Sequence, residues 1–101
     1  MKYFAVIRER GPAWNSSVPM REQKRWKDHA ALMNALAREG FVVLGGPLGE
    51  GERRFLLIFN ANSKKTIETR LDADPWTSMR MLQITSIEHW EILLKKPRQT
   101  N

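Results

Sequence analysis

Apolar residues fall in four short runs of the kind that form β-strands. The run at residues 2–9 alternates, so a strand would place successive side chains on opposite faces. The runs at residues 41–48 and 53–60 are short, continuous and rich in Val, Ile and Phe, which favours buried strands over helices. The last run, residues 81–94, loses its alternation at Ser86-Ile87, where we expect a bulge.

The run at residues 41–48 has the strongest signal of the four. Four large apolar residues stand between Gly40 and Gly45, and no polar residue alternates with them. Because both faces of such a strand need cover, we expect a central strand rather than an edge strand. Gly45, Gly46 and Pro47 end the strand, and this exit forms either one wall of a cleft or only a turn.

Two segments between the strands have a helical pattern. Residues 20–39 consist mainly of strong helix formers with no internal Gly or Pro, and Gly40 follows them as a stop signal. Ser63 can cap a second helix that continues to about residue 72. Residues 11–19 are loop by composition, and Trp14 is their only large anchor.

The predicted order is strand, helix, strand, strand, helix, strand. This order is typical of the split βαβ, or ferredoxin-like, α+β fold, in which two helices cover one face of a four-stranded antiparallel sheet. Strands that are apolar on both faces would leave the other sheet face exposed, and a large apolar patch is unusual for a soluble monomer. We therefore expect a symmetric homodimer in which two sheets pack face to face.

Length and composition narrow the class of protein. The 101 residues, of which 42% are hydrophobic, suit one domain over residues 1–96 followed by a basic tail at residues 97–101. The absence of cysteine excludes disulfides, thiolate nucleophiles and sulfur-ligated metal sites. No apolar run has the length of a signal peptide or a membrane span, so we expect a cytoplasmic protein without a membrane partner.

The formal net charge of +6 attracts anions, whether nucleic acid or an acidic small molecule. The basic residues fall mostly on predicted helix surfaces and loop ends, which favours a solvated face over a nucleic-acid groove. The RNA recognition motif shares the predicted strand order, but its third strand needs glycine and an aromatic ring where residues 53–59 have aliphatic side chains. RNA binding is therefore the weaker hypothesis.

One histidine lies in the middle of the apolar face of the predicted first helix. At about 100° per residue, His29 falls among Trp26, Leu32, Met33 and Leu36. An imidazole in apolar surroundings needs a hydrogen-bond partner, because burying it unpaired is costly.

Asp74 is the candidate partner for His29. It precedes Pro75, where it can cap a short helical turn, and the second helix should bring this turn beside the first helix. A His-Asp pair fixes the imidazole tautomer and leaves the second ring nitrogen as a general base or acid. The alternative is that His29 is a satisfied core residue and Asp74 is only a helix cap.

Further residues are candidates for a substrate pocket around this pair. Gly46 and Pro47 with Trp76 would shape the pocket, and Trp14 could line it or belong to the core. Arg8, at the end of the first strand, would meet an anionic substrate or only water.

Metal and cofactor chemistry have weaker support. His89 lies on the last strand, and no short ligand spacing joins it to His29 or Asp74. The glycines near residues 45–51 lack the strand-to-helix context of a phosphate loop. We therefore expect neither a metal nor a cofactor.

Several segments occur in an order that matches a known family. They are Tyr3-Phe4-Ala5-Val6, the helix with His29, Met33 and Leu36 before Gly40, Gly46-Pro47-Leu48, Asp74-Pro75-Trp76 and Glu88-His89-Trp90. This series, which spans nearly the whole chain, resembles the YCII-related family of small dimeric α/β-barrel proteins.

The resemblance implies a homodimer with His29 and Asp74 as the active-site pair. It also implies relatives that act on small aromatic or lactone-like compounds, including dehydrochlorinases. We therefore expect a cofactor-independent enzyme of the lyase, isomerase or hydrolase type that acts on a small cyclic or anionic substrate. A non-catalytic binding or regulatory protein is the alternative. The loop at residues 11–19 and the basic tail depart from the family pattern and leave the substrate open.

Overall fold

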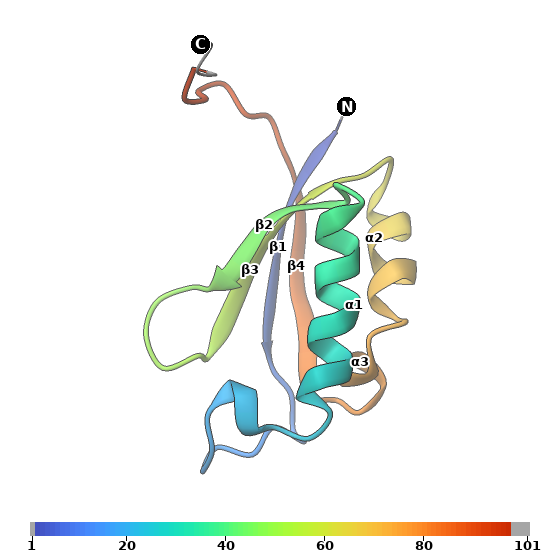
Figure 1. Ribbon diagram of the computed structural model, residues 1–101. Coiled ribbons are helices and arrows are strands. Elements are labelled where there is room, and N and C mark those ends of the chain that lie inside the picture. Colours follow the sequence, from blue (N-terminus) through green and yellow to red (C-terminus); the bar gives the residue numbers. More distant parts are fainter. Residues whose placement is uncertain (1, 98–101) are drawn as a thin grey trace.

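The computed structural model describes residues 2–97 and contains four strands and a set of helices and helical turns (Figure 1). The strands are β1 (Tyr3–Arg10), β2 (Val42–Pro47), β3 (Arg54–Asn60) and β4 (Leu82–Trp90). The helical segments are η1 (Met20–Glu22), α1 (Trp26–Arg38), α2 (Lys64–Leu71) and α3 (Pro75–Ser78).

The strands form one antiparallel sheet in the order β2-β3-β1-β4, and the helices lie on one face of it (Figure 1). This arrangement confirms the predicted ferredoxin-like α+β fold, including the hairpin between β2 and β3. No helix within residues 2–97 has the length and apolarity to cross a membrane.

The prediction that residues 41–48 form a central strand is wrong, because β2 is an edge strand. Val42 on the helix-facing side is buried in the main core cluster, whereas Leu44 on the opposite side is 60% exposed. The apolar pattern indicates that both faces of a strand need cover, but it does not show whether other strands pair with both of its edges.

Two apolar clusters lie between the sheet and the helices. The larger contains Phe4, Val6 and Phe59 from the strands and Ile67 and Leu71 from α2. The smaller is aromatic and lies at the other end of the sheet, where Trp14, Phe55 and Trp76 pack together. The second cluster positions the candidate site described below.

The first helix begins later than predicted. Residues 20–22 form a single 3-10 turn, and α1 starts only at Trp26, after Arg25 in a left-handed backbone conformation with φ of 59°. The side chain of Gln23 donates to the carbonyls of Asn15 and Val18, which holds this segment as part of the preceding loop. Tertiary hydrogen bonds therefore override the helix propensity of residues 20–25.

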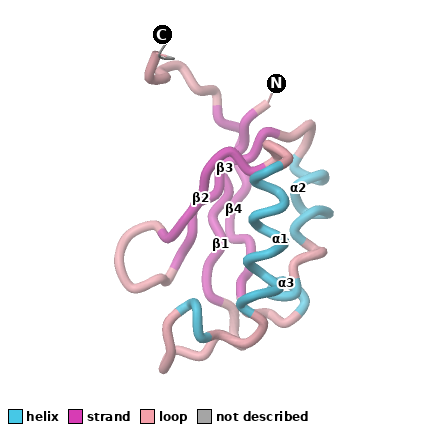
Figure 2. Tube along the Cα trace, viewed as in Figure 1, coloured by secondary structure: helices cyan, strands magenta, loops and turns pink. Residues whose placement is uncertain are grey.

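The last strand differs from its prediction at two points. Register with β1 passes from Ser86 opposite Ile7 to Ile84 opposite Arg8, so Thr85 is the additional residue of a bulge that lies just before the expected Ser86-Ile87. The strand also ends at Trp90 rather than at residue 94, and residues 91–97 leave the body of the protein as an extended segment (Figure 2). Most of the predicted basic tail, residues 98–101, lies outside the described residues.

Candidate functional site

His29 and Asp74 are in contact, as expected from the sequence. His29 projects from α1, Asp74 immediately precedes α3, and 2.7 Å separates His29 Nδ1 from Asp74 Oδ2. Both residues are buried, with exposed fractions of 8% and 0%. A short buried contact between these groups has the geometry of the His-Asp pairs that orient an imidazole.

Local sequence explains why the carboxylate of Asp74 is free to bind a partner. Asp74 has an extended backbone, Pro75 occupies the first position of α3, and the amide of Trp76 donates to Asp74 Oδ1 at 2.9 Å. This cap uses only one carboxylate oxygen. Asp74 therefore acts as the helix cap and contacts His29 at once, and is not only a helix cap.

Arg8 makes a contact that the sequence analysis missed. Its Nη1 donates to Asp74 Oδ2 at 3.0 Å, and its Nη2 donates to Thr77 Oγ1 at 3.0 Å. Arg8 is only 1% exposed, and two of its three guanidinium nitrogens bind protein groups. The alternation of β1 contained this signal, because Arg8 follows Phe4 and Val6 on the face that the helices cover.

The environment shifts the pKa values of the two charged groups. Burial alone would raise the pKa of Asp74, but its interactions with His29, the charge of Arg8 and the hydrogen bond from the Trp76 amide together hold that pKa below its ordinary value. Burial lowers the pKa of Arg8, and the charge and hydrogen bond of Asp74 oppose that change. Arginine remains protonated in proteins, so Asp74 and Arg8 form a buried ion pair.

The imidazole of His29 is fixed in orientation by its neighbours. Its ring stacks on Trp76 with 3.9 Å between ring centroids and 9° between the planes, and Trp26 lies 5.7 Å away at a tilt. Trp76 is itself anchored, because its Nε1 donates to the carbonyl of Lys24 at 2.7 Å. When neutral His29 donates from Nδ1 to Asp74, its lone pair lies on Nε2.

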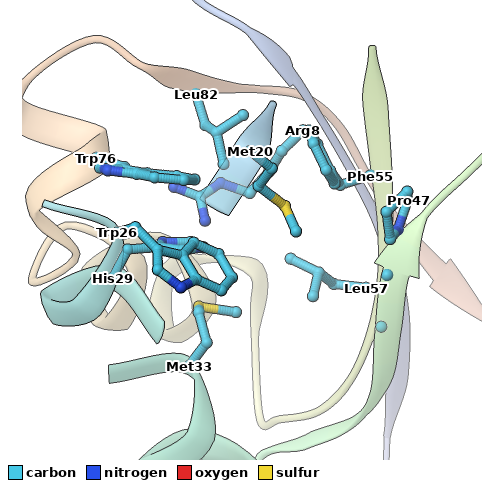
Figure 3. Close-up of a pocket in the computed structure, with 12 residues that line it drawn as sticks. Arg8, Met20, Trp26, His29, Met33, Pro47, Phe55, Leu57, Trp76 and Leu82 are labelled. Atoms are coloured by element: carbon cyan, nitrogen blue, oxygen red, sulfur yellow. The ribbon is translucent and has the colours of Figure 1, made fainter. Parts of the chain in front are cut away.

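A cavity of about 160 Å³ opens beside this imidazole (Figure 3). Its walls are mostly apolar and come from α1, the exit of β2, the facing strands and the loop before α1. The lining residues are Arg8, Met20, Trp26, His29, Met33, Gly45, Gly46, Pro47, Phe55, Leu57, Trp76 and Leu82.

Four of the five predicted substrate-binding residues line this cavity, namely Arg8, Gly46, Pro47 and Trp76. Trp14 instead packs against Phe55 and Trp76, with centroid distances of 6.1 and 5.6 Å, as part of the aromatic cluster. Sequence reasoning also missed the apolar lining residues Met20, Phe55 and Leu57, since a strand pattern does not show which inward side chains border a cavity.

The long loop before α1 forms part of the cavity wall through Met20. The amide of Met20 donates to Glu52 Oε1 at 2.9 Å, and Arg10 Nε donates to the carbonyl of Glu52 at 2.8 Å. The first bond joins the segment before α1 to the turn between β2 and β3, and the second joins the end of β1 to the same turn. This turn and the segment before α1 lie at the same end of the sheet as α3 (Figure 2). Met20, just after the predicted loop at residues 11–19, is thus the part of this segment that lines the cavity.

Other sequence candidates lie apart from this cavity. His89 is exposed on β4 and makes an edge contact with Phe4 at 5.6 Å. Within residues 2–97, no three side chains of His, Cys, Asp or Glu gather as metal ligands would. On β3, Phe55 and Phe59 are buried in the core clusters, so this strand does not present rings on an open sheet face as an RNA recognition motif would.

Comparison with known proteins supports the fold. No family model matches the sequence, and no curated protein is significantly similar to it. Among solved structures, the chain resembles 5-chloro-2-hydroxyhydroquinone dehydrochlorinase (TftG) from Burkholderia phenoliruptrix AC1100 in complex with 2,5-dihydroxybenzoquinone. The TM-score is 0.56 and the sequence identity 21%, over 87% of this chain and 93% of that chain. The two proteins have related folds, and membership of the YCII-related family stays a prediction.

Proposed function

We propose that this protein is a cofactor-independent enzyme that transfers a proton on a small cyclic compound, with His29 as the general base and Asp74 as its orienting partner. The observation that carries the proposal is the 2.7 Å contact between His29 Nδ1 and the buried Asp74 carboxylate at the wall of an apolar cavity. A base held in this way keeps one nitrogen for the substrate, while the carboxylate stabilises the imidazolium that forms.

The size and lining of the cavity support a substrate with a single ring. An apolar cavity of about 150 Å³ can hold benzene, and this one measures about 160 Å³. The indoles of Trp26 and Trp76 and the ring of Phe55 border it, which suits a flat molecule. Because Arg8 already neutralises Asp74, the site favours a ring with hydroxyl or carbonyl oxygens over a strongly anionic substrate.

The fold neighbour narrows the class of reaction that we propose. Its printed name describes a dehydrochlorinase of a chlorinated hydroxyhydroquinone. In such an elimination, a base accepts the proton from the ring compound and chloride leaves with its bonding electron pair. His29 Nε2 could accept that proton here. The same base could instead return the proton to another ring atom, which would be an isomerisation.

The test is turnover of a panel of halogenated hydroquinones and lactones by the wild type and by variants of the pair. We expect His29→Gln and Asp74→Asn to lower kcat/KM by about 10²–10⁴-fold, which is the usual contribution of a general base. Asp28→Asn, which alters an exposed carboxylate on the same helix, serves as the control. Turnover that survives in both variants would contradict the proposal.

The same panel distinguishes a binding protein from an enzyme. If the protein only binds its ligand, calorimetry would show a compound of the panel that binds the wild type and Asp74→Asn equally well and that neither protein converts. That result would favour a non-catalytic binding or regulatory role and would count against proton transfer.

We also propose that two copies associate through the sheet face opposite the helices. Leu44 and Trp90 are 60% and 44% exposed, and Ala5, Leu56 and Ile58 border a shallow apolar hollow beside Trp90. A second copy is the occupant that matches this face, because a symmetric pair would cover the same apolar surface on both sheets.

A further inference from the structure

The buried carboxylate of Asp74 has two candidate cations on one oxygen. Arg8 Nη1 and His29 Nδ1 lie 3.0 and 2.7 Å from the same atom, Asp74 Oδ2. A carboxylate with no exposed surface needs a positive charge nearby, since burying it alone is very costly. If His29 supplied that charge, it would be an imidazolium without a lone pair and could not act as a base.

Arg8 supplies this positive charge permanently. Its guanidinium does not lose its proton, and its Nη2 is held at 3.0 Å by Thr77 Oγ1. The hydroxyl of Thr77 in turn donates to the carbonyl of Leu71 at 2.7 Å, which directs its lone pairs toward Arg8. Arg8 Nε is buried and has no hydrogen-bond partner among the described residues. Burying a donor in this way costs free energy, so hydrogen bonding alone does not explain why an arginine occupies this position.

We propose that Arg8 is a positioning residue that neutralises Asp74 and so leaves His29 uncharged, with its Nε2 lone pair available to the cavity. This inference rests on the proposed function, and it reassigns Arg8 from substrate contact to the charge balance of the site. Thr77 contributes to this positioning, because its hydroxyl accepts a hydrogen bond from Arg8 and holds the guanidinium against the carboxylate.

No other charge of the described residues competes for this role. Arg8 and His29 are the charged or titratable side chains that form ion-pair contacts with Asp74. On α1, Arg25 and Asp28 pair with each other at the surface. The remaining titratable side chains on the strands and helices lie on six elements, and β2 and α3 carry none. They are Tyr3, Glu9 and Arg10 on β1, Arg21 and Glu22 on η1, Lys27 and Arg38 on α1, Arg54 on β3, Lys64, Lys65, Glu68 and Arg70 on α2, and Glu88 and His89 on β4.

The charge of His29 can be measured without a substrate. The chain has two histidines, so nitrogen-15 NMR of the imidazoles gives two sets of signals, and His89→Gln assigns them. For the wild type near neutral pH, we expect a neutral His29 ring with its proton on Nδ1. In Arg8→Met, His29 should take up its proton at a higher pH than in the wild type, because the competing positive charge on Asp74 Oδ2 is gone.

Matched variants separate charge from packing. Arg8→Lys keeps a positive charge at the position, so its His29 titration should return toward the wild type. Arg70→Met removes an arginine from an exposed pair with Glu39 and should leave the titration of His29 unchanged. Thr77→Val, which removes the hydroxyl but keeps the volume, should give a smaller shift than Arg8→Met.

Two outcomes would overturn the proposal: a His29 titration in folded Arg8→Met equal to that of the wild type, or an imidazolium in the wild type near neutral pH. If Arg8→Met does not fold, the NMR signals of His29 in the wild type still test the proposal, because they distinguish a neutral ring from an imidazolium. Failure of the proposed function has a different signature, since the NMR results would then hold while no compound of the panel is converted.

Discussion

Asp74 is the residue on which most of the candidate site depends. Its two oxygens accept from the Trp76 amide, from His29 and from Arg8, and none of its surface is exposed. The sequence predicted the cap and the contact with His29, because each uses a local or helical pattern. It did not predict the contact with Arg8, which lies 66 positions away on the sheet.

The depressed pKa of Asp74 predicts a specific loss of stability in acid. The unfolded chain binds the Asp74 proton near the ordinary value of 3.8, and the folded protein binds it only at lower pH. The stabilisation is thus complete above that value and is lost as the pH falls through the folded-state pKa. Urea unfolding between about pH 5 and pH 3 measures it. Asp28→Asn should keep the pH dependence of the wild type, and an Asp74→Asn variant that also kept it would contradict the assignment.

Gly45 and Gly46 offer a matched pair of substitutions at the cavity wall. A Cβ on Gly45 would lie 2.4 Å from Leu57 Cδ2 and 3.2 Å from the Leu56 carbonyl, whereas a Cβ on Gly46 meets nothing within 4 Å. We expect Gly45→Ala to lower the free energy of unfolding by about 1–3 kcal/mol through overpacking. Gly46→Ala should change it by no more than about 0.5 kcal/mol. Equal losses in urea unfolding would count against this packing.

At the scale of elements, the sequence predicted what depends on local pattern. The four strands, the Ser63 cap, the Asp74 cap and the stop at Gly40, whose φ is 81°, are present. The predicted start of the first helix and the predicted central position of β2 were wrong, because both features depend on distant contacts. Hydrogen bonds of Gln23 govern the first, and the strand order governs the second.

The left-handed backbone of Arg25 at the start of α1 leads to a test of that boundary. Its φ of 59° disfavours side chains other than glycine. Arg25→Gly and Arg25→Ala both lose the exposed pair with Asp28, but only glycine relieves the strain. We expect Arg25→Gly to be more stable than Arg25→Ala by about 0.5–1 kcal/mol in thermal or urea unfolding. Equal stability would mean that the helix does not begin at this residue.

At the scale of the whole molecule, the sheet has one covered and one open face (Figure 1). The proposed dimer predicts that light scattering at micromolar concentration gives twice the mass of the chain. Leu44→Asp, which places a charge on the open face, should shift the protein toward monomer. Lys65→Asp on the exposed side of α2 is the control. A monomeric wild type would contradict the proposed association.

The placement of the four indoles has a spectroscopic consequence. Trp14, Trp26 and Trp76 form one aromatic group around the imidazole, while Trp90 stands on the opposite face of the sheet. A protonated imidazole quenches the emission of an indole stacked on it. In a Trp90→Phe protein, the remaining fluorescence would therefore report a proton taken up by the imidazole stacked on Trp76. In the wild type, Trp90 is the indole on the open sheet face and would respond to association of two copies.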